Sequence, residues 1–259
     1  MVIKQAPISG LSGMGGGTTG LSVVGGGLTI KAPFDMACNF DGNSATMGWQ
    51  SGSVQDELHS TGSQGPLQNW SSTGGLDNGG HYAAAGGDTN DNKWDMPNVQ
   101  SVEGNYIDGE VRDFDQYALS CWVKTTSTAD SGHYTVYETI LGDTSGNVFG
   151  GFGISQGKPC LTNATQDLIA YNTVNSGNWT HIGFLLEPTS LKLFINGEVD
   201  RTFTNVTWSQ YLAFNQFCGT YDYGNAKIAN LDAVVIWVDR NISEQDITDA
   251  YTIGNFSGI

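Results

Sequence analysis

Basic residues are scarce in this chain, with 10 Lys and Arg against 26 Asp and Glu among 259 residues and a formal charge of −16. Such a chain repels phosphate groups, so we expect no nucleic-acid partner. Long apolar runs are also missing, because no stretch approaches the roughly 20 residues that cross a bilayer, and we expect no membrane partner. The first residues lead into Gly and Ser instead of an apolar segment, so no secretory signal is visible.

Two kinds of reactive pattern are absent as well. The cysteines form no C-x-x-C pair, which argues against a zinc cluster. Cys121 lies in an apolar strand pattern and is expected to be a free, buried thiol. No Gly-x-Ser-x-Gly elbow accompanies any of the four histidines, so a hydrolase triad is not predicted. His181 is expected to lie on a strand, where it packs or forms a hydrogen bond.

Glycine is abundant at the start of the chain. Residues 8–29 are too rich in it to fold alone, because glycine loses the most backbone entropy on ordering. We therefore predict that residues 1–33 form an extended assembly arm and that residues 34–259 form the folded domain. The arm is expected to dock onto neighbouring subunits of a homo-oligomer through main-chain hydrogen bonds. Its apolar anchors would be Leu21, Val23, Val24, Leu28 and Ile30.

Short apolar runs separated by Gly, Asn, Asp and Ser follow from about residue 34, a pattern of many strands joined by turns. Asn196-Gly197 predicts a tight hairpin turn, because both turn positions need a positive φ. Ser243 followed by Asp246 predicts the N-terminus of a short closing helix through Tyr251. Residues 50–117 are expected to form long rim loops. The predicted strands cover residues 119–124, 136–141, 148–154, 168–174, 179–186, 191–195, 199–203 and 228–238.

The order of these pieces resembles the laminin-G-like jelly-roll superfamily, which includes pentraxin-like and concanavalin-A-like lectin modules. The segments that carry the resemblance are residues 40–43, 118–124, 179–182 with 191–198, and 228–234 with 242–247. The resemblance implies an all-β fold, a two-sheet antiparallel jelly-roll sandwich with the Gly-rich arm and a short C-terminal helix added. The alternation of Leu191, Leu193 and Ile195 with Lys192, Phe194 and Asn196 agrees, since it places an apolar row on one face of a strand.

Glycan hydrolases share this sandwich, and they need paired carboxyl groups across the scissile bond. The Glu-x-Asp-x-x-Glu spacing of the laminarinase-like branch is absent here. Glu103, Asp108 and Glu110 form the nearest acidic cluster, for which a solvated loop is the competing interpretation. We therefore predict that the chain is not an enzyme and has no catalytic residues.

Binding residues can be proposed in the turn-rich segments. Asp88, Asn90 and Asn92 place oxygen atoms at alternating positions, and Asp41 and Asp143 could join them from other turns. Two interpretations stand: a calcium site at the rim, as in many sandwich lectins, or an Asx-rich turn that bonds its own backbone. Calcium is the only cofactor considered. Candidate sugar platforms are Trp49, Trp70, Trp94, Tyr221 and Tyr223, with packing or subunit contact as the alternative role. Trp122, Trp179 and Trp237 lie in predicted strands and are expected in the core.

Two functions are compatible with these features. The arm, the missing signal and a composition that resembles the tail and decoration proteins of marine phages predict a non-catalytic virion structural protein. We prefer a capsid-decoration role to a tail fibre, because no heptads or fibrous repeats are present. The alternative is a glycan-binding lectin or adhesin with rim calcium. The location would be the virion in the first case and extracellular in the second.

Overall fold

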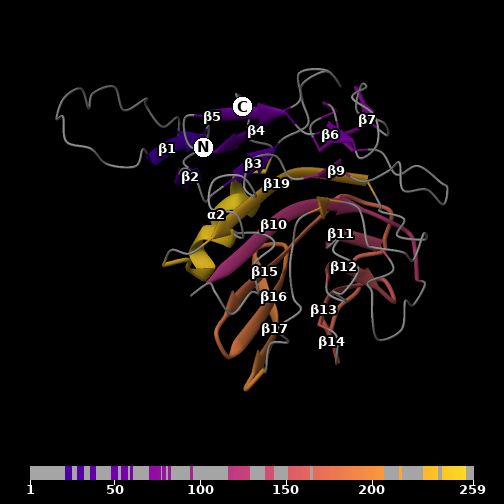
Figure 1. The fold of residues 1–259 in the computed structure, drawn as a ribbon. Helices are drawn as coiled ribbons and strands as arrows, with labels where there is room; N and C mark the ends of the chain where they lie inside the picture. The colour runs from indigo at the N-terminus through magenta and orange to yellow at the C-terminus, as the bar shows by residue number, and fades with distance from the viewer. Residues whose placement is uncertain are drawn as a thin grey trace, which may run out of the picture.

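The computed structural model describes the chain in segments. These are residues 21–24, 28–31, 36–38, 48–51, 54–57, 59–60, 70–76, 78–79, 81–82, 94–95, 116–128, 138–142, 151–163, 166–206, 216–217, 230–238 and 241–254. Within them the chain forms two antiparallel sheets of ten and seven strands, a separate two-stranded hairpin and one helix (Figure 1). The predicted two-sheet sandwich with a short C-terminal helix is confirmed.

The ten-stranded sheet holds the longest strands. Its main path runs β17-β16-β15-β10-β19-β3-β4-β5, with β8 beside β19 and β7 beside β8. The bounds are β3 Met36–Cys38, β4 Gly48–Ser51, β5 Val54–Glu57, β7 Trp70–Ser71, β8 His81–Tyr82, β10 Tyr117–Lys124, β15 Thr180–Glu187, β16 Ser190–Ile195, β17 Glu198–Thr204 and β19 Asn230–Val238.

The seven-stranded sheet runs β14-β13-β12-β11-β18-β9-β6. Its bounds are β6 His59–Ser60, β9 Trp94–Asp95, β11 Glu138–Gly142, β12 Gly151–Ser155, β13 Lys158–Asn163, β14 Gln166–Ile169 and β18 Gln216–Phe217. The hairpin pairs β1 (Leu21–Val24) with β2 (Leu28–Lys31). The helix, α2, spans Glu244–Ile253.

The alternating side chains of β10 divide between two cores. Tyr117, Leu119 and Cys121 point into the sandwich, where Tyr117 stacks on Phe184 of the neighbouring strand at 5.8 Å between ring centroids. Phe152 from the opposite sheet meets Phe184 edge-on at 4.8 Å, so aromatic rings join the two layers. Apolar residues that face between two sheets in this way form the core of a β-sandwich.

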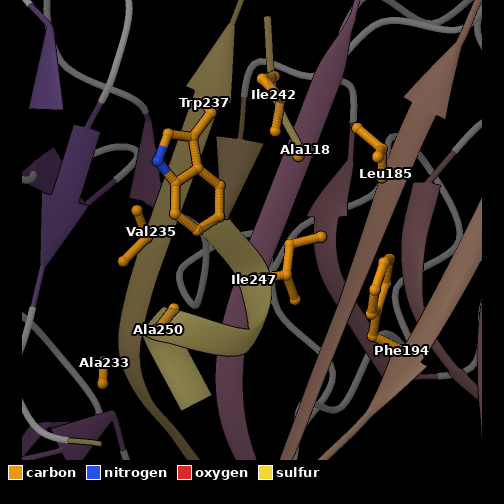
Figure 2. Close-up of a cluster of buried hydrophobic side chains, with 9 residues drawn as sticks. All are labelled: Ala118, Leu185, Phe194, Ala233, Val235, Trp237, Ile242, Ile247 and Ala250. Atoms are coloured by element: carbon orange, nitrogen blue, oxygen red, sulfur yellow. The ribbon is translucent and has the colours of Figure 1, made fainter. Parts of the chain in front are cut away.

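The other face of β10 lies beneath α2, and Figure 2 shows the second core there. Ile247 and Ala250 of the helix are buried against strands β10, β15, β16 and β19. The helix begins as predicted: Asp246 accepts hydrogen bonds from the backbone N–H and the hydroxyl group of Ser243. The remaining members of this core are Ala118, Leu185, Phe194, Ala233, Val235, Trp237 and Ile242.

The predicted turn between β16 and β17 is confirmed, with φ values of 51° at Asn196 and 78° at Gly197. Helix α2 also contacts this turn. Thr248 donates its hydroxyl hydrogen to the Gly197 carbonyl oxygen at 2.8 Å, and the Tyr251 ring lies directly over Gly197. A Cβ added to Gly197 would meet that ring at 2.7 Å, so the position requires glycine for two independent reasons.

The structure corrects or completes several sequence-based predictions. The predicted strand 168–174 ends at Ile169, and strand β13 is an addition to the predicted set. Residues 50–117 are predicted to be rim loops, yet their described parts include short strands of both sheets. The alternation in β16 groups Phe194 with the outward-facing residues, but Phe194 is fully buried because α2 covers that face. Cys121 is buried and forms no disulfide, as predicted.

Replacing Gly197 by Ala should lower the free energy of unfolding by about 2–4 kcal/mol, because backbone strain and overlap with Tyr251 add. Gly177 has nearly the same φ, 76°, but its added Cβ would only touch a Thr126 methyl group at 3.2 Å. Gly177→Ala is therefore the matched control and should cost about 1–2 kcal/mol. Urea titrations of both variants measure the difference, and equal losses would show that the helix contact contributes nothing.

Candidate functional site

Tyr171 is the most exposed of the large apolar side chains that the structure describes, with 63% of its surface accessible. It lies two residues beyond the end of β14, the outermost strand of the seven-stranded sheet. The backbone N–H of Ala170 still bonds to Pro159 of β13, and that of Val174 bonds to Gly157, so both ends of the intervening turn are fixed. Tyr171, Asn172 and Thr173 between these points are all exposed.

Asp200 holds this turn from the other sheet. It lies on β17, the outermost strand of the ten-stranded sheet, at a point where the pairing with β16 is irregular. One carboxylate oxygen accepts the backbone N–H of Tyr171 and the other accepts the side-chain amide of Asn172, each at 2.5 Å. The carboxylate thereby fixes the direction of the Asn172 amide group.

Arg201 makes a second bridge between the two sheets. Its Nη1 donates to the carbonyl oxygen of Ile169 at 2.7 Å. Its Cζ lies 4.5 Å from the ring centroid of Tyr171 and 4.4 Å from that of Phe203, distances at which cation–π attraction is significant. The residue is partly buried, and three neighbours position its guanidinium group.

These side chains form one surface, which we call the edge platform: Tyr171, Asn172, Asp200, Arg201 and Phe203. An exposed aromatic ring offers a flat apolar face to a ligand. Amide, carboxylate and guanidinium groups beside it offer both donors and acceptors in fixed directions. This combination suits a flat, hydroxyl-rich molecule with one less polar face, which is the chemistry of a sugar ring.

A second polar cluster lies under α2 and is closed to solvent. Ser120 Oγ and His181 Nε2 are 2.6 Å apart, and both residues are buried, at 1% and 0% exposure. Trp122 and Tyr251 cover the imidazole ring at centroid distances of 5.5 and 5.4 Å. The pair resembles part of a nucleophilic triad, but a substrate has no access to it. The prediction that His181 lies on a strand and packs or forms a hydrogen bond is confirmed, and it does both.

A triad would also need a carboxylate to orient the imidazole through its second nitrogen. His181 Nδ1 is buried and has no hydrogen-bond partner among the described residues. Asp232 of β19 is buried, and it accepts the backbone N–H groups of Leu76 and Ala233 at 2.8 Å each. Burial lowers the pKa of His181 to about 3, so the imidazole is neutral at physiological pH. The cluster therefore contributes to packing.

Three of the five predicted sugar platforms lie in described strands. Trp49 lies in β4 opposite Asp56, Trp70 in β7 opposite Tyr82, and Trp94 in β9 between Phe217 and Ser60. Tyr221 and Tyr223 lie outside the described residues. These five aromatic residues remain predictions.

The predicted calcium ligands Asp41, Asp88, Asn90, Asn92 and Asp143 also lie outside the described residues, as do Glu103, Asp108 and Glu110. Among the described side chains, no group of three or more His, Cys, Asp and Glu residues could hold a metal ion. Within the same residues, no helix is long and apolar enough to cross a membrane. The calcium site stays a prediction.

The arm anchors occupy the hairpin, with Leu21, Val23 and Val24 in β1 and Leu28 and Ile30 in β2. The two strands pair with each other, Val24 opposite Leu28, and their docking onto other subunits stays a prediction. Of the three tryptophans expected in the core, Trp237 is fully buried and Trp122 is partly buried and packs against the second core. Trp179 is only partly buried and donates its ring N–H to Gly74.

Sequence reasoning misses the edge platform because its two halves are far apart in the chain. Tyr171 falls inside the predicted strand 168–174, which hides the turn that exposes it. Asp200 and Arg201 fall inside the predicted strand after Asn196-Gly197. Asn172 just after an apolar run is a usable turn signal, but nothing in the sequence links it to Asp200, 28 residues later.

Comparison with known proteins agrees with this architecture. Residues 101–248 match the family model described as the concanavalin A-like lectin/glucanases superfamily. The match covers more than half of the chain and most of the long strands. No curated protein sequence matches the chain.

Solved structures with the same fold include two binding domains and one domain of an arabinanase. The binding domain of Paraclostridial Mosquitocidal Protein 1 has 13% identity and a TM-score of 0.58, over 83% of this chain and 51% of that one. Domain 4 of AbnA, an extracellular arabinanase from Geobacillus stearothermophilus solved with arabinotriose, has 16% identity and a TM-score of 0.55, over 83% and 97%.

The ligand-binding domain of botulinum neurotoxin serotype D, solved with N-acetylneuraminic acid, has 13% identity and a TM-score of 0.53, over 84% and 50%. This chain therefore spans about half the length of the two toxin domains. At these identities the likeness shows the fold.

The buried imidazole of His181 should make the protein sensitive to acid. The unfolded chain takes up a proton at this histidine near pH 6.5, whereas the folded protein, in which burial lowers the pKa, does so only near pH 3. Below pH 6.5 the unfolded state thus binds more protons, and the free energy of unfolding should fall by up to about 1.4 kcal/mol per pH unit until pH 3. Urea titrations between pH 7 and pH 4 measure this slope.

The control is His181→Gln, which does not titrate but can still hydrogen-bond to Ser120. Its unfolding free energy should depend less steeply on pH, whatever its absolute stability. Identical slopes in the two proteins would contradict a neutral, buried imidazole at position 181.

Proposed function

Because the chain belongs to the concanavalin A-like lectin/glucanase superfamily, we propose that it is a glycan-binding module and that the edge platform holds the sugar. The observation that carries the proposal is the exposed Tyr171 ring, placed beside the Asn172 amide and the Arg201 guanidinium. Two structures with the same fold are named as complexes with a sugar, arabinotriose or N-acetylneuraminic acid, which supports this ligand class.

In this proposal, a sugar ring stacks on Tyr171 while its hydroxyl groups bond to Asn172 and Arg201. Asp200 is a positioning residue, because both of its carboxylate oxygens already accept hydrogen bonds from the turn that carries Tyr171. The bridges to Asp200 and Ile169 restrain the site before ligand arrives. Binding to a restrained site loses less conformational entropy on complex formation.

We propose binding without cleavage. Hydrolysis of a glycosidic bond uses two carboxyl groups on opposite sides of that bond. The edge platform contains one carboxylate, and its hydrogen bonds commit it to positioning. A bound oligosaccharide should therefore release no new reducing ends on long incubation. Turnover that disappears in Glu103→Gln or Glu110→Gln would instead support the hydrolase alternative.

Tyr171→Ala should weaken binding of a glycan identified on an array by about fivefold, since loss of stacking on an aromatic ring costs on the order of 1 kcal/mol. Trp94→Ala is the matched comparison, because Trp94 is one of the platforms predicted from sequence. Isothermal titration calorimetry of both variants, with thermal melts to check folding, distinguishes the two sites. Loss of binding in Trp94→Ala with none in Tyr171→Ala would move the site away from the edge platform.

The virion role is a separate prediction that rests on the Gly-rich arm. The comparisons support glycan binding better than a virion role, and the two functions are compatible. Removing residues 1–30 should leave a folded sandwich that is monomeric, whereas the full chain should form defined oligomers in mass photometry. If both proteins have the same number of subunits per particle, the arm is not an assembly device.

A further inference from the structure

We infer that the edge platform selects sugars that carry a carboxylate group, with Arg201 as the group that receives it. This inference rests on the proposed function and specifies its ligand class. It depends on three properties of Arg201: its charge has no acidic partner among the described residues, its guanidinium group is fixed in place, and most of its donors are uncommitted.

Among the described residues, no carboxylate neutralises the charge of Arg201. Acidic residues outnumber basic ones by 26 to 10 in the chain. Lys192 pairs with two of them, with its Nζ 2.8 Å from Glu244 and 3.9 Å from Glu187. Among the described residues, Arg201 forms no such ion pair, although Asp200 is its neighbour in sequence. The Asp200 oxygens bond to Tyr171 and Asn172 instead.

The guanidinium group is also preorganised. Tyr171 and Phe203 flank it at 4.5 and 4.4 Å, and one N–H group is committed to the Ile169 carbonyl oxygen. Contacts between arginine and aromatic rings typically involve the flat faces of the guanidinium group and leave its in-plane N–H groups available. Two parallel in-plane N–H groups match the two oxygens of a carboxylate, and such charge-assisted bonds are about twice as strong as neutral ones.

The surroundings limit the ligand to one carboxylate at a time. The platform has a single cation, and the chain as a whole carries a formal charge of −16, which disfavours polyanions such as nucleic acids. The Tyr171 ring and the Asn172 amide meanwhile suit the uncharged remainder of a sugar. A hexuronic or nonulosonic acid combines these features, whereas a neutral hexose lacks the group that Arg201 would bind.

The test compares each acid with its own methyl ester, which has nearly the same shape but no charge. The probes are galacturonic acid and N-acetylneuraminic acid, each with one carboxylate, titrated into the full chain and followed by isothermal titration calorimetry or ligand-observed NMR. At least one acid should bind about ten times more tightly, or better, than its ester, since a charge-assisted bidentate contact is about twice as strong as a neutral one. This comparison uses the unmodified protein, so it does not depend on any variant folding.

Variants then assign the preference to Arg201. Arg201→Gln should remove the difference between acid and ester, whereas Arg201→Lys, which keeps the charge but loses the planar fork, should retain part of it. Lys124→Gln is the control for net charge, because Lys124 lies on β10, separated from β17 by β15 and β16. It should leave the preference unchanged.

The outcomes separate this inference from the proposed function. Equal binding of acid and ester, or tighter binding of neutral sugars, with a loss in Tyr171→Ala would overturn the carboxylate preference and leave the glycan-binding function intact. A preference that survives in Arg201→Gln would also overturn the assignment. Failure to bind every sugar, neutral or acidic, would overturn both proposals.

Discussion

The rest of the structure depends on strand β10, which is buried on both faces. Its alternating side chains enter two separate cores, one between the sheets and one beneath α2. A shift of one residue in its pairing with β15 would exchange these faces and place Ser120 inside the sandwich. The register of β10 therefore also determines where α2 packs. Through the contact of the helix with Gly197, it is linked to the hairpin turn between β16 and β17.

This arrangement separates the residues that stabilise the fold from the proposed binding surface. The two cores lie against the central strands of the ten-stranded sheet. Tyr171 lies beside β14, at the edge of the seven-stranded sheet, and Arg201 lies on β17, at the edge of the ten-stranded sheet. The hydrogen bonds from the Asp200 carboxylate and to the Ile169 carbonyl oxygen hold those edges together. The edge platform lies apart from both cores, so its chemistry can differ while the packing around β10 stays the same. Ser120 and His181 tolerate substitution less well than the platform residues, because both are buried and form a hydrogen bond with each other.

The features that depend on local chemistry can be predicted from the sequence. Asn196-Gly197 and Ser243 with Asp246 specify their turn and helix start through residues that are adjacent or three apart. The alternation in β16 correctly places Leu191 and Leu193 in the core, but it leaves Phe194 outside because only the distant helix buries that side. The edge platform could not be predicted for the same reason. It forms where the last strands of two sheets meet, and that meeting is a property of the whole topology.

The bridges between the sheet edges have a thermodynamic consequence. Tyr171 and Asn172 come from one layer and Asp200 and Arg201 from the other, so the complete platform exists only while the two layers are in place. A ligand that contacts residues from both layers connects the two sheets at this edge. Such a ligand binds the native state and not the unfolded chain. By mass action, a ligand at 100 times its dissociation constant adds about 2.7 kcal/mol to the free energy of unfolding. The melting temperature is therefore a measure with which the proposed sugar ligands can be screened.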